Sequence, residues 1–328
     1  MRAIWLSSRR AWMPPVPAAN ACRTASSCAP GIGCRWSDSL EMRLYTYVSK
    51  GRVRLGAERD GRLIELPFPD MRALICAGRA GLAKARSILR MAPQRVGVPV
   101  SRARLLGPLP APGKILCSGL NYRSHIDENP DAKFLSDPRF FGKFNNCVIG
   151  PGEPIRHPGP EYKVDYEVEL AVVVGRRMFR ASEDVVMGRI FGYTIFNDVS
   201  SRWIQFKDAN EMMGKNFDTF APMGPCIVTA DEIPDPSVLG LRLKLNGQVM
   251  QDGTNRDWCF PLPRLISWLS SAMTFDPGDI VTTGTPAGIG YFRSPQVFLK
   301  PGDTCSLEID QIGRLENPVV AIGSTRHR

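Results

Sequence analysis

The segment Val164–Val174 constrains the fold of this chain most, because it is apolar and strand-like but contains two glutamates. Successive side chains of a strand point to opposite faces, so Glu167 and Glu169 share one face while Val168 and Leu170 take the other. Two carboxylates side by side next to a core repel each other and lose hydration. One of them must take up a proton, or a cation must neutralise both. The alternative interpretation is that both glutamates lie on a solvated face of a sheet.

A second apolar, strand-like segment, Gly192–Asn197, is followed directly by another acid, Asp198. Asp198 could therefore add a third carboxylate to the two glutamates. Carboxylate oxygens bind hard divalent cations such as Mg²⁺, Mn²⁺ or Ca²⁺. From the residues alone, two hypotheses stay open: a divalent-metal site at Glu167, Glu169 and Asp198, and a solvated acidic face.

The composition is that of a globular protein, with 43% hydrophobic and 23% charged residues in a chain of 328. No stretch approaches the ~20 apolar residues that a membrane span needs, so we expect no membrane partner. The net charge is +10, but lysines and arginines are scattered and form no basic run interleaved with aromatics. We therefore expect no nucleic-acid partner. A basic surface or a site for a small anion explains the charge as well.

The first 41 residues differ from the rest because they are rich in arginine and contain no acid before Asp38. Such a leader resembles a mitochondrial transit peptide. The alternative is a non-native extension with Met42 as the true first residue, which the strand-like alternation after Met42 favours slightly. The nine cysteines include no C-x-x-C pair and indicate reduced thiols. We predict a cytoplasmic protein, or one of the mitochondrial matrix if the leader is native.

Two domains are expected after this leader: a small α+β domain at residues 42–110 and a larger one at 111–323, followed by a tail at 324–328. In the small domain, apolar patterns predict strands at Arg43–Val48, Val53–Glu58 and Arg62–Glu65 and a helix at Leu74–Met91. In the larger domain they predict strands at Val168–Val174, Gly192–Phe196, Pro225–Thr229, Leu241–Leu245, Ile280–Thr283 and Thr304–Ile309.

The larger domain has many short strands and few long helices. Asn246-Gly247 is a strong hairpin signal between two strand-like runs. The clearest amphipathic helix is predicted at Pro261–Phe275. Together these patterns predict an α+β fold that is mostly β, with a closed or rolled sheet instead of a doubly wound one.

His125 is one of only three histidines and stands three residues before Glu128. On a helix the two side chains would share a face, and the carboxylate could orient the imidazole as a general base. A lone surface histidine near an acid is the commoner arrangement.

Three further polar residues follow Asp198. Arg202 and Gln205 would lie on its side of a helix, and an arginine there could clamp a substrate carboxylate. Lys215 could stabilise a developing oxyanion, although an ordinary exposed lysine is the simpler interpretation. The glycine-rich segment Thr282–Gly290 follows a strand but fits neither a P-loop nor the dinucleotide fingerprint. It is a backbone-lined substrate loop or a plain tight turn.

In this order, the segments resemble the fumarylacetoacetate hydrolase family over about Met42–Val320. The matching pieces are Gly119–Tyr122 with His125, Val164–Val174, Gly192–Ser200, Gly214–Gly224, Gly278–Gly290 and Val297–Asp303. The version here is most similar to the branch of domain-containing protein 2 and its bacterial relatives.

The resemblance implies a rolled mixed sheet, a homodimer, and Mg²⁺ or a similar ion on Glu167, Glu169 and Asp198. It also implies that His125 and Glu128 form a water-activating dyad on a mobile lid. Substrate contacts would come from Arg202, Gln205, Lys215 and Thr285. The chain departs from the family pattern in three places, namely Ser200–Trp203, the lid at Glu128–Pro138 and Trp258.

The expected activity is metal-dependent hydrolysis of a carbon–carbon bond in a small 2,4-dioxo acid, such as an acylpyruvate or fumarylacetoacetate-like compound. The alternative is a keto–enol isomerase or tautomerase of the oxaloacetate or 2-hydroxyhepta-2,4-diene-1,7-dioate type, or an oxaloacetate decarboxylase. All share the same enolate chemistry in 2-oxo acid metabolism. A non-catalytic organic-acid-binding protein is the remaining hypothesis.

Overall fold

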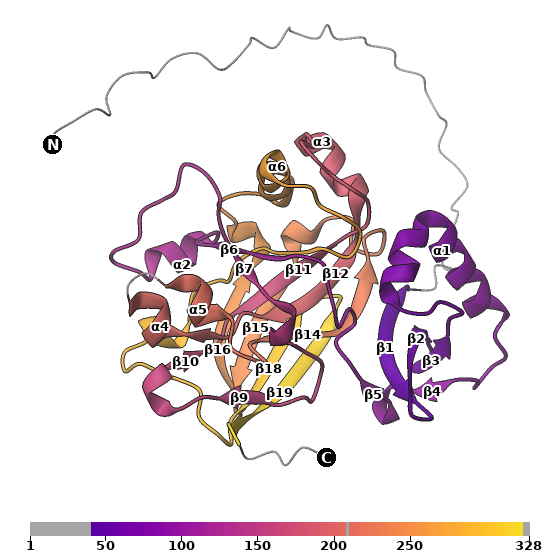
Figure 1. The fold of residues 1–328 in the computed structure, drawn as a ribbon, viewed down its shortest axis with the longest axis horizontal. Helices are drawn as coiled ribbons and strands as arrows, with labels where there is room; N and C mark the ends of the chain where they lie inside the picture. Colours follow the sequence, from indigo (N-terminus) through magenta and orange to yellow (C-terminus); the bar gives the residue numbers. More distant parts are fainter. Residues whose placement is uncertain (1–40, 208–209, 324–328) are drawn as a thin grey trace, which may run out of the picture. The chain divides into compact units, whose positions relative to one another are not determined.

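The computed structural model describes residues 41–207 and 210–323, which are drawn in colour in Figure 1. The predicted leader, apart from Glu41, and the predicted tail lie outside the described residues. The domain boundaries expected there stay predictions.

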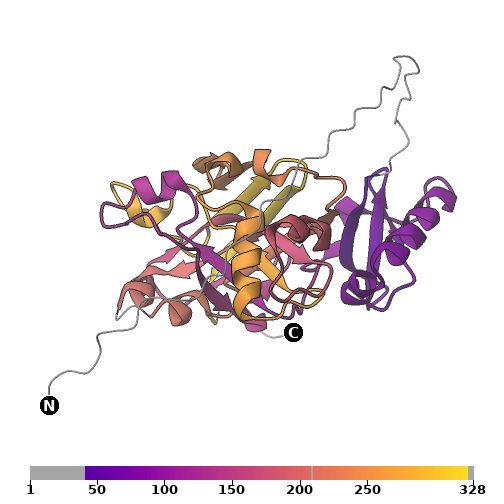
Figure 2. The same ribbon diagram turned by 90° about the horizontal axis from the view of Figure 1, so that it is seen from above.

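The N-terminal part is a three-stranded meander covered by one long helix (Figures 1 and 2, indigo and purple). The helix α1 begins after Asp70, whose side chain accepts a hydrogen bond from the Ala73 N–H at 2.8 Å. It bends at Gly78, where φ is +55°, a backbone conformation that glycine adopts without strain. The elements are β1 (Arg43–Ser49), β2 (Arg52–Arg59), β3 (Arg62–Glu65), α1 (Met71–Met91), β4 (Val98–Pro99) and β5 (Arg104–Leu105).

This meander continues into the main sheet, because β1 pairs antiparallel with β14, with Leu44 opposite Ile227. The strand order is β4-β3-β2-β1-β14-β12-β11-β17-β6-β7, with β5 beside β1 and β8 beside β14. The pairs β17–β6 and β14–β8 are parallel, so the sheet is mixed. The added strands are β6 (Ile115–Gly119), β7 (Arg139–Lys143), β8 (Val148–Ile149), β11 (Val168–Val174), β12 (Ile190–Asn197), β14 (Ala221–Thr229) and β17 (Ile280–Thr282).

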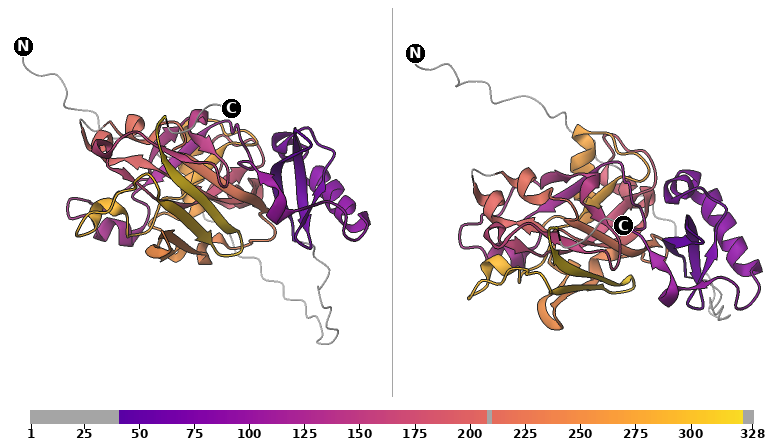
Figure 3. Two further views of the ribbon diagram at one scale, coloured as in Figure 1. Left: turned by 90° about the horizontal axis from the view of Figure 1, so that it is seen from below. Right: turned by 60° about the horizontal axis from the view of Figure 1, so that its bottom comes forward.

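A second sheet has the order β16-β15-β18-β19-β9, and Figure 3 shows it from below with β18 and β19 in yellow. Its first two strands form the predicted hairpin, with positive φ at both Asn246 and Gly247. The strands are β9 (Ile155–His157), β15 (Gly240–Leu245), β16 (Gln248–Thr254), β18 (Thr304–Ile309) and β19 (Gly313–Ala321). A separate short pair joins β10 (Val164–Asp165) to β13 (Ser200–Ser201).

The strand β11 is buried on both faces and separates two parts of the core. Val168 and Leu170 belong to one apolar cluster, whereas Ala171 and Val173 belong to the other. By the same alternation Glu169 faces the second cluster, and it is 1% exposed. The interpretation of a solvated acidic face is therefore wrong.

The remaining helices are short and lie in two groups (Figure 1). α4 packs against α5, which also contacts β7, while α3 packs against α6. On α6, four of the predicted apolar residues are buried, namely Leu262, Leu265, Ile266 and Leu269. These helices are α2 (Arg123–Asp127), α3 (Glu183–Val186), α4 (Arg202–Phe206), α5 (Glu211–Lys215) and α6 (Leu262–Ala272). The predicted mostly-β, α+β fold with a mixed sheet is confirmed.

In the part of the chain that the structure describes, no helix has both the length and the apolar character needed to cross a membrane.

Candidate active site

Three buried carboxylates meet where the first residues of β11 lie beside the end of β12. These strands are antiparallel neighbours with Val168 opposite Asn197, so the residues flanking that pair come together. Each of Glu167, Glu169 and Asp198 offers an oxygen, and these oxygens lie within 4.8 Å of one another. The predicted juxtaposition of the three acids is therefore present.

Three buried cations surround these acids. Lys215 Nζ donates to Glu167 Oε2 at 2.8 Å and to Asp198 Oδ2 at 2.7 Å. Lys143 Nζ donates to Asp198 Oδ1 at 2.7 Å, and Arg202 Nη2 donates to Glu167 Oε1 at 2.6 Å. Lys215 ends α5 and is 2% exposed, so the interpretation of an ordinary surface lysine is wrong.

Glu169 has no comparable cation. Its Oε2 is buried without a hydrogen-bond partner among the described residues. Burial, followed by the charges of Asp198 and Glu167, raises the pKa of Glu169 well above its usual value. Burial also raises the pKa of Glu167, but Lys215 and Arg202 together outweigh it and hold that pKa below its usual value. Glu169 is thus the acid that holds a proton when no other cation is present.

The donor set fits a hard divalent cation. Three carboxylates converge, one of them has an unpartnered buried oxygen, and each carboxylate oxygen can accept more than one interaction. A divalent ion that displaces the Glu169 proton would give the cluster the charge it needs to attract an anionic substrate.

The His125–Glu128 pair forms on α2 as the spacing predicts. His125 Nδ1 lies 2.6 Å from Glu128 Oε1. The second carboxylate oxygen, Oε2, accepts the Gly288 N–H at 2.7 Å. Since an ionised carboxylate only accepts hydrogen bonds, Nδ1 carries the proton and Nε2 is left as the basic nitrogen.

The glycine-rich segment connects the dyad to the acidic cluster. Besides the Gly288 N–H on Glu128, the Gly290 N–H donates to Asp165 Oδ1 at 2.8 Å. Thr285 Oγ1 donates to the Val168 carbonyl at 2.9 Å and accepts from Gln251 at 2.8 Å. These backbone contacts go beyond a plain tight turn.

A cavity of about 270 Å³ lies over the acidic cluster. Its lining includes seven of the predicted site residues, namely His125, Glu167, Glu169, Arg202, Gln205, Lys215 and Thr285. Glu128 and Asp198 stand behind this lining, in contact with His125 and Lys215.

The guanidinium of Arg202 is already bound by protein groups. Its Nε donates to Asp165 Oδ2 at 2.9 Å and its Nη1 to Gln205 Oε1 at 2.9 Å, while Nη2 binds Glu167. The side chain is 2% exposed. The clamp role expected for Arg202 stays a prediction, and the geometry supports a role in positioning Glu167 and Gln205.

Sequence reasoning missed three functional side chains. Lys143 lies at the end of β7, within an apolar stretch whose partner strand is distant in sequence. Asp165 accepts from Arg202 and from the N–H groups of Gly290 and Tyr291. Gln251 accepts the Val168 N–H at 3.0 Å. Only Asp165 had a visible signal, because it stands in the same acidic segment as the two glutamates.

The chain matches a known protein family and several of its members. Residues 114–320 match the family described as "Fumarylacetoacetate (FAA) hydrolase C-terminal". Oxaloacetate tautomerase fahd2, mitochondrial, of Xenopus laevis is 39% identical over 296 residues, which cover 87% of this chain and 92% of that protein.

Among solved structures, fumarylacetoacetate hydrolase from Exiguobacterium antarcticum matches with a TM-score of 0.74 and 31% identity, covering 85% of this chain and 99% of that one. The 2-hydroxyhepta-2,4-diene-1,7-dioate isomerase from Mycobacterium marinum matches with a TM-score of 0.68 and 34% identity, covering 86% and 100%. With the family match and a relative this similar over most of its length, the chain is an enzyme of the fumarylacetoacetate hydrolase family.

Proposed function

We propose that the chain is a Mg²⁺-dependent keto–enol tautomerase of a small 2-oxo acid of the oxaloacetate type. The observation that carries the proposal is one cavity that holds both a carboxylate cluster suited to a divalent ion and a histidine with an oriented basic nitrogen. The tautomerase of Xenopus laevis supports the choice of reaction.

The site would act on a substrate held by its 2-oxo carboxylate end. Glu167, Glu169 and Asp198 would hold the ion, which supplies Lewis-acid polarisation of the 2-oxo group when bound. Lys143, Lys215 and Arg202 fix the two acids they bind, so that little reorganisation is needed.

His125 would move the proton. Its Nε2 is free to accept the proton from C3 of the keto form, because Nδ1 is bound to Glu128. The same nitrogen would deliver that proton to the 2-oxo oxygen, which gives the enol, and the reaction from enol to keto is the reverse transfer from this oxygen to C3. Glu128 balances the charge of the imidazolium while Gly288 holds Glu128 in place.

Lys215 and Gln205 would stabilise negative charge on the 2-oxo oxygen. Lys215 donates two of its three N–H groups to Glu167 and Asp198, so one N–H remains for the substrate. Gln205 lines the cavity beside Arg202. Thr285 lies at the rim of the same cluster and would contact the substrate.

Hydrolysis of a 2,4-dioxo acid is the second candidate. It is favoured by the carboxylate behind His125, since a His–Glu pair can also activate water for attack on the distal carbonyl. The hydrolase of Exiguobacterium antarcticum shares the fold. Decarboxylation of oxaloacetate and binding without turnover are the remaining outcomes.

The deciding experiment follows enol-oxaloacetate and acetylpyruvate by ultraviolet absorbance, with Mg²⁺ and with EDTA, while pyruvate is measured in parallel. Mg²⁺-dependent loss of enol-oxaloacetate without pyruvate is expected. Pyruvate released from acetylpyruvate would replace the proposal by hydrolysis, and pyruvate released from oxaloacetate would replace it by decarboxylation. Binding of oxalate without any turnover would indicate the binding protein.

His125→Asn tests the proton carrier. We expect kcat to fall by about 10²- to 10⁴-fold, with the Mg²⁺ affinity unchanged. His157→Asn is the matched control, because His157 is buried but does not line the cavity. Full activity of His125→Asn would contradict the assignment.

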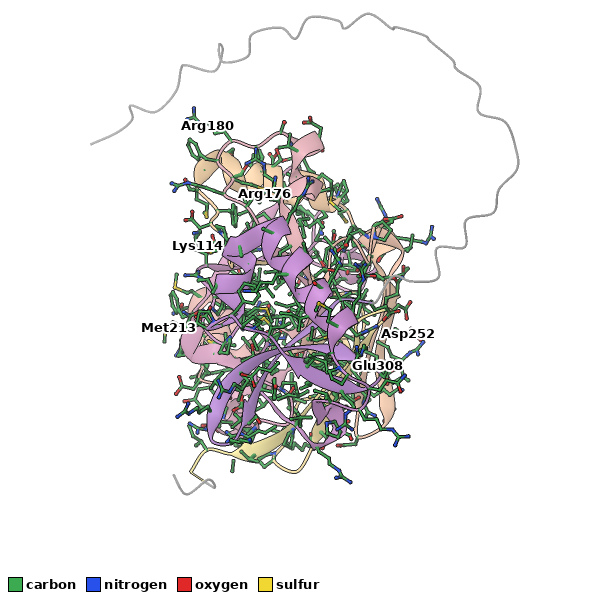
Figure 4. All side chains as sticks on the ribbon, turned by 90° about the vertical axis from the view of Figure 1, so that its right-hand side faces the viewer. Lys114, Arg176, Arg180, Met213, Asp252 and Glu308 are labelled. Atoms are coloured by element: carbon green, nitrogen blue, oxygen red, sulfur yellow. The ribbon has the colours of Figure 1, made fainter. Side chains whose placement is uncertain are left out.

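We further propose that the enzyme is a homodimer. Four large apolar side chains on or beside α4 and α5 are exposed, namely Trp203, Phe206, Met212 and Met213. Figure 4 shows Met213 at the margin of the molecule. Light scattering during size exclusion measures the mass directly, and a monomer at micromolar concentration would contradict the proposal.

The compartment depends on the mature N-terminus. We propose that the enzyme works in the cytoplasm. The alternative is the mitochondrial matrix, since the name of the Xenopus laevis relative assigns that protein to mitochondria. Fractionation of its own cells with mass spectrometry of the N-terminus tests this: recovery of the enzyme in the cytosolic fraction is expected, and a cleaved leader in a mitochondrial fraction would move the enzyme to the matrix.

A further inference from the structure

The cavity is lined by three fixed cations, and they differ in how far protein groups already neutralise them. Arg202 and Lys215 are each 2% exposed and bind two carboxylates apiece. Arg139 is different: its side chain is 52% exposed, and its one ion pair within the described residues is to Glu211, at 2.8 Å. Arg139 is therefore the cavity cation whose charge is least neutralised by protein groups, and it has more hydrogen-bonding capacity to spare for a ligand than Arg202 or Lys215.

The strand β7 places Arg139 at a distance from the carboxylate cluster. Arg139, Phe141 and Lys143 alternate onto one face of β7, and Lys143 binds Asp198 at the cluster end. Lys215 lies over the Phe141 ring, 4.9 Å from its centroid. Four residues of strand separate Arg139 from Lys143 by about 13 Å between Cα atoms. The long arginine side chain spans part of this distance and reaches the cavity wall.

We propose that Arg139 binds the distal carboxylate of a dicarboxylic 2-oxo acid, and that Glu211 occupies Arg139 until that carboxylate arrives. The inference rests on the proposed function, since it assumes that the 2-oxo carboxylate end of the substrate lies at the acidic cluster. A substrate with an uncharged distal group gains nothing from Arg139.

Glu211 is built to exchange partners. Its Oε2 accepts from Arg139, while its Oε1 lies 3.5 Å from Gln205 Nε2. When a substrate carboxylate takes Arg139, Glu211 keeps the amide of Gln205, which in turn contacts Arg202. A ligand without a carboxylate at its distal end cannot replace Glu211 on the arginine, so the pair selects for 2-oxo acids that carry a distal carboxylate.

The test compares two ligands on the Mg²⁺-loaded full chain by calorimetry. Difluoro-oxaloacetate with both fluorines on C3 carries the distal carboxylate and cannot enolise, whereas oxalate lacks that carboxylate. Arg139→Gln is expected to weaken difluoro-oxaloacetate by about 10- to 100-fold, with oxalate changed by less than about twofold. Glu211→Gln removes the competing charge and is expected to tighten difluoro-oxaloacetate without affecting oxalate.

Opposite signs for the two variants distinguish this role from a merely structural one. Arg242→Gln is the matched control. Arg242 forms an exposed ion pair with Asp252, with 3.1 Å between nitrogen and oxygen, and it does not line the cavity. Two results would overturn the proposal. One is an equal loss of affinity for both ligands in Arg139→Gln, and the other is weaker binding of difluoro-oxaloacetate in Glu211→Gln. If the wild type binds difluoro-oxaloacetate through Arg139 but does not tautomerise enol-oxaloacetate, the proposed function fails. The recognition of a distal carboxylate by Arg139 then still holds.

Discussion

Glu167 and Glu169 stand two residues apart on the same side of one strand, yet their pKa values move in opposite directions. Burial raises both, but only Glu167 has cations close enough to reverse the effect. The surroundings of the pair therefore favour the charged form of Glu167 and the protonated form of Glu169, and a divalent ion bound as proposed would have to displace the Glu169 proton.

This asymmetry predicts that the two amide substitutions change the stability of the metal-free protein by unequal amounts. Glu169→Gln replaces a protonated acid by a group of the same shape, so the free energy of unfolding should change by less than about 1 kcal/mol. Glu167→Gln leaves Arg202 and Lys215 short of a buried partner and should cost about 3–5 kcal/mol. Urea unfolding with EDTA measures both.

Both variants should lose the stabilisation that Mg²⁺ gives the wild type, since each removes a carboxylate ligand. The measurement is the shift of the melting temperature on adding Mg²⁺. A wild-type shift retained by Glu169→Gln would exclude Glu169 as a ligand.

His157 should make the protein less stable in acid. Burial lowers the pKa of His157 below 6.5, and its Nδ1 accepts the Gly159 N–H at 3.2 Å, which a protonated ring cannot do. Between the folded pKa and 6.5 the unfolded chain binds more protons, so stability falls as the pH drops through this window. In His157→Asn, the free energy of unfolding should therefore depend less steeply on pH below 6.5 than in the wild type. An unchanged slope would show that His157 does not cause the loss of stability in acid.

Gly288 should be required for turnover but not for the metal. Its φ is +104°, and a Cβ would lie 2.2 Å from the Met250 carbonyl oxygen, so Gly288→Ala must displace the N–H that holds Glu128. We expect kcat to fall by at least about tenfold while Mg²⁺ still raises the melting temperature. Gly302→Ala is the control, because Gly302 has a similar φ of +99° with nothing near its Cβ position. Equal activities of the two variants would contradict the role.

Two buried tyrosines should respond oppositely to loss of the hydroxyl. Tyr193 Oη is buried without a partner among the described residues, so Tyr193→Phe should leave stability unchanged or raise it by about 1 kcal/mol. Tyr122 Oη donates to Asn255 Oδ1, and Tyr122→Phe leaves that buried oxygen unpaired at a cost of about 1–3 kcal/mol. Thermal unfolding of both variants measures the difference, and a large loss in Tyr193→Phe would indicate a bound partner for its hydroxyl.

The features that sequence predicted best are those set by short-range periodicity. The alternation of Val168, Glu169 and Leu170 fixed which side chains share a face, and the spacing of three residues was enough to pair His125 with Glu128. The many short strands predicted a fold that is mostly β, whereas the mixed sheet was implied by the family resemblance. Apart from the mixed sheet, neighbours along the chain carry the information.

The features that were missed depend on partners far apart in the chain. Lys143 binds Asp198 across 55 residues of sequence, and β7 and β12 are not neighbours in the strand order, so no local pattern reveals the pair. The hydrogen bond from Arg202 to Asp165 could not be predicted either. The sequence around an arginine does not indicate whether its guanidinium is already bound by a carboxylate of the protein. The bend of α1 at Gly78 was hidden by an apolar pattern that continues through it.

Because β1 pairs with β14, the N-terminal meander supplies hydrogen-bond partners for backbone groups along one side of β14 in the main sheet. Without residues 42–110, the stretch of β14 around Ile227 and Val228 would become a free strand edge with unsatisfied N–H and C=O groups. Such an edge recruits strands from other molecules. By pairing with β14, the strand β1 satisfies these backbone groups and removes an edge to which strands of other molecules could add.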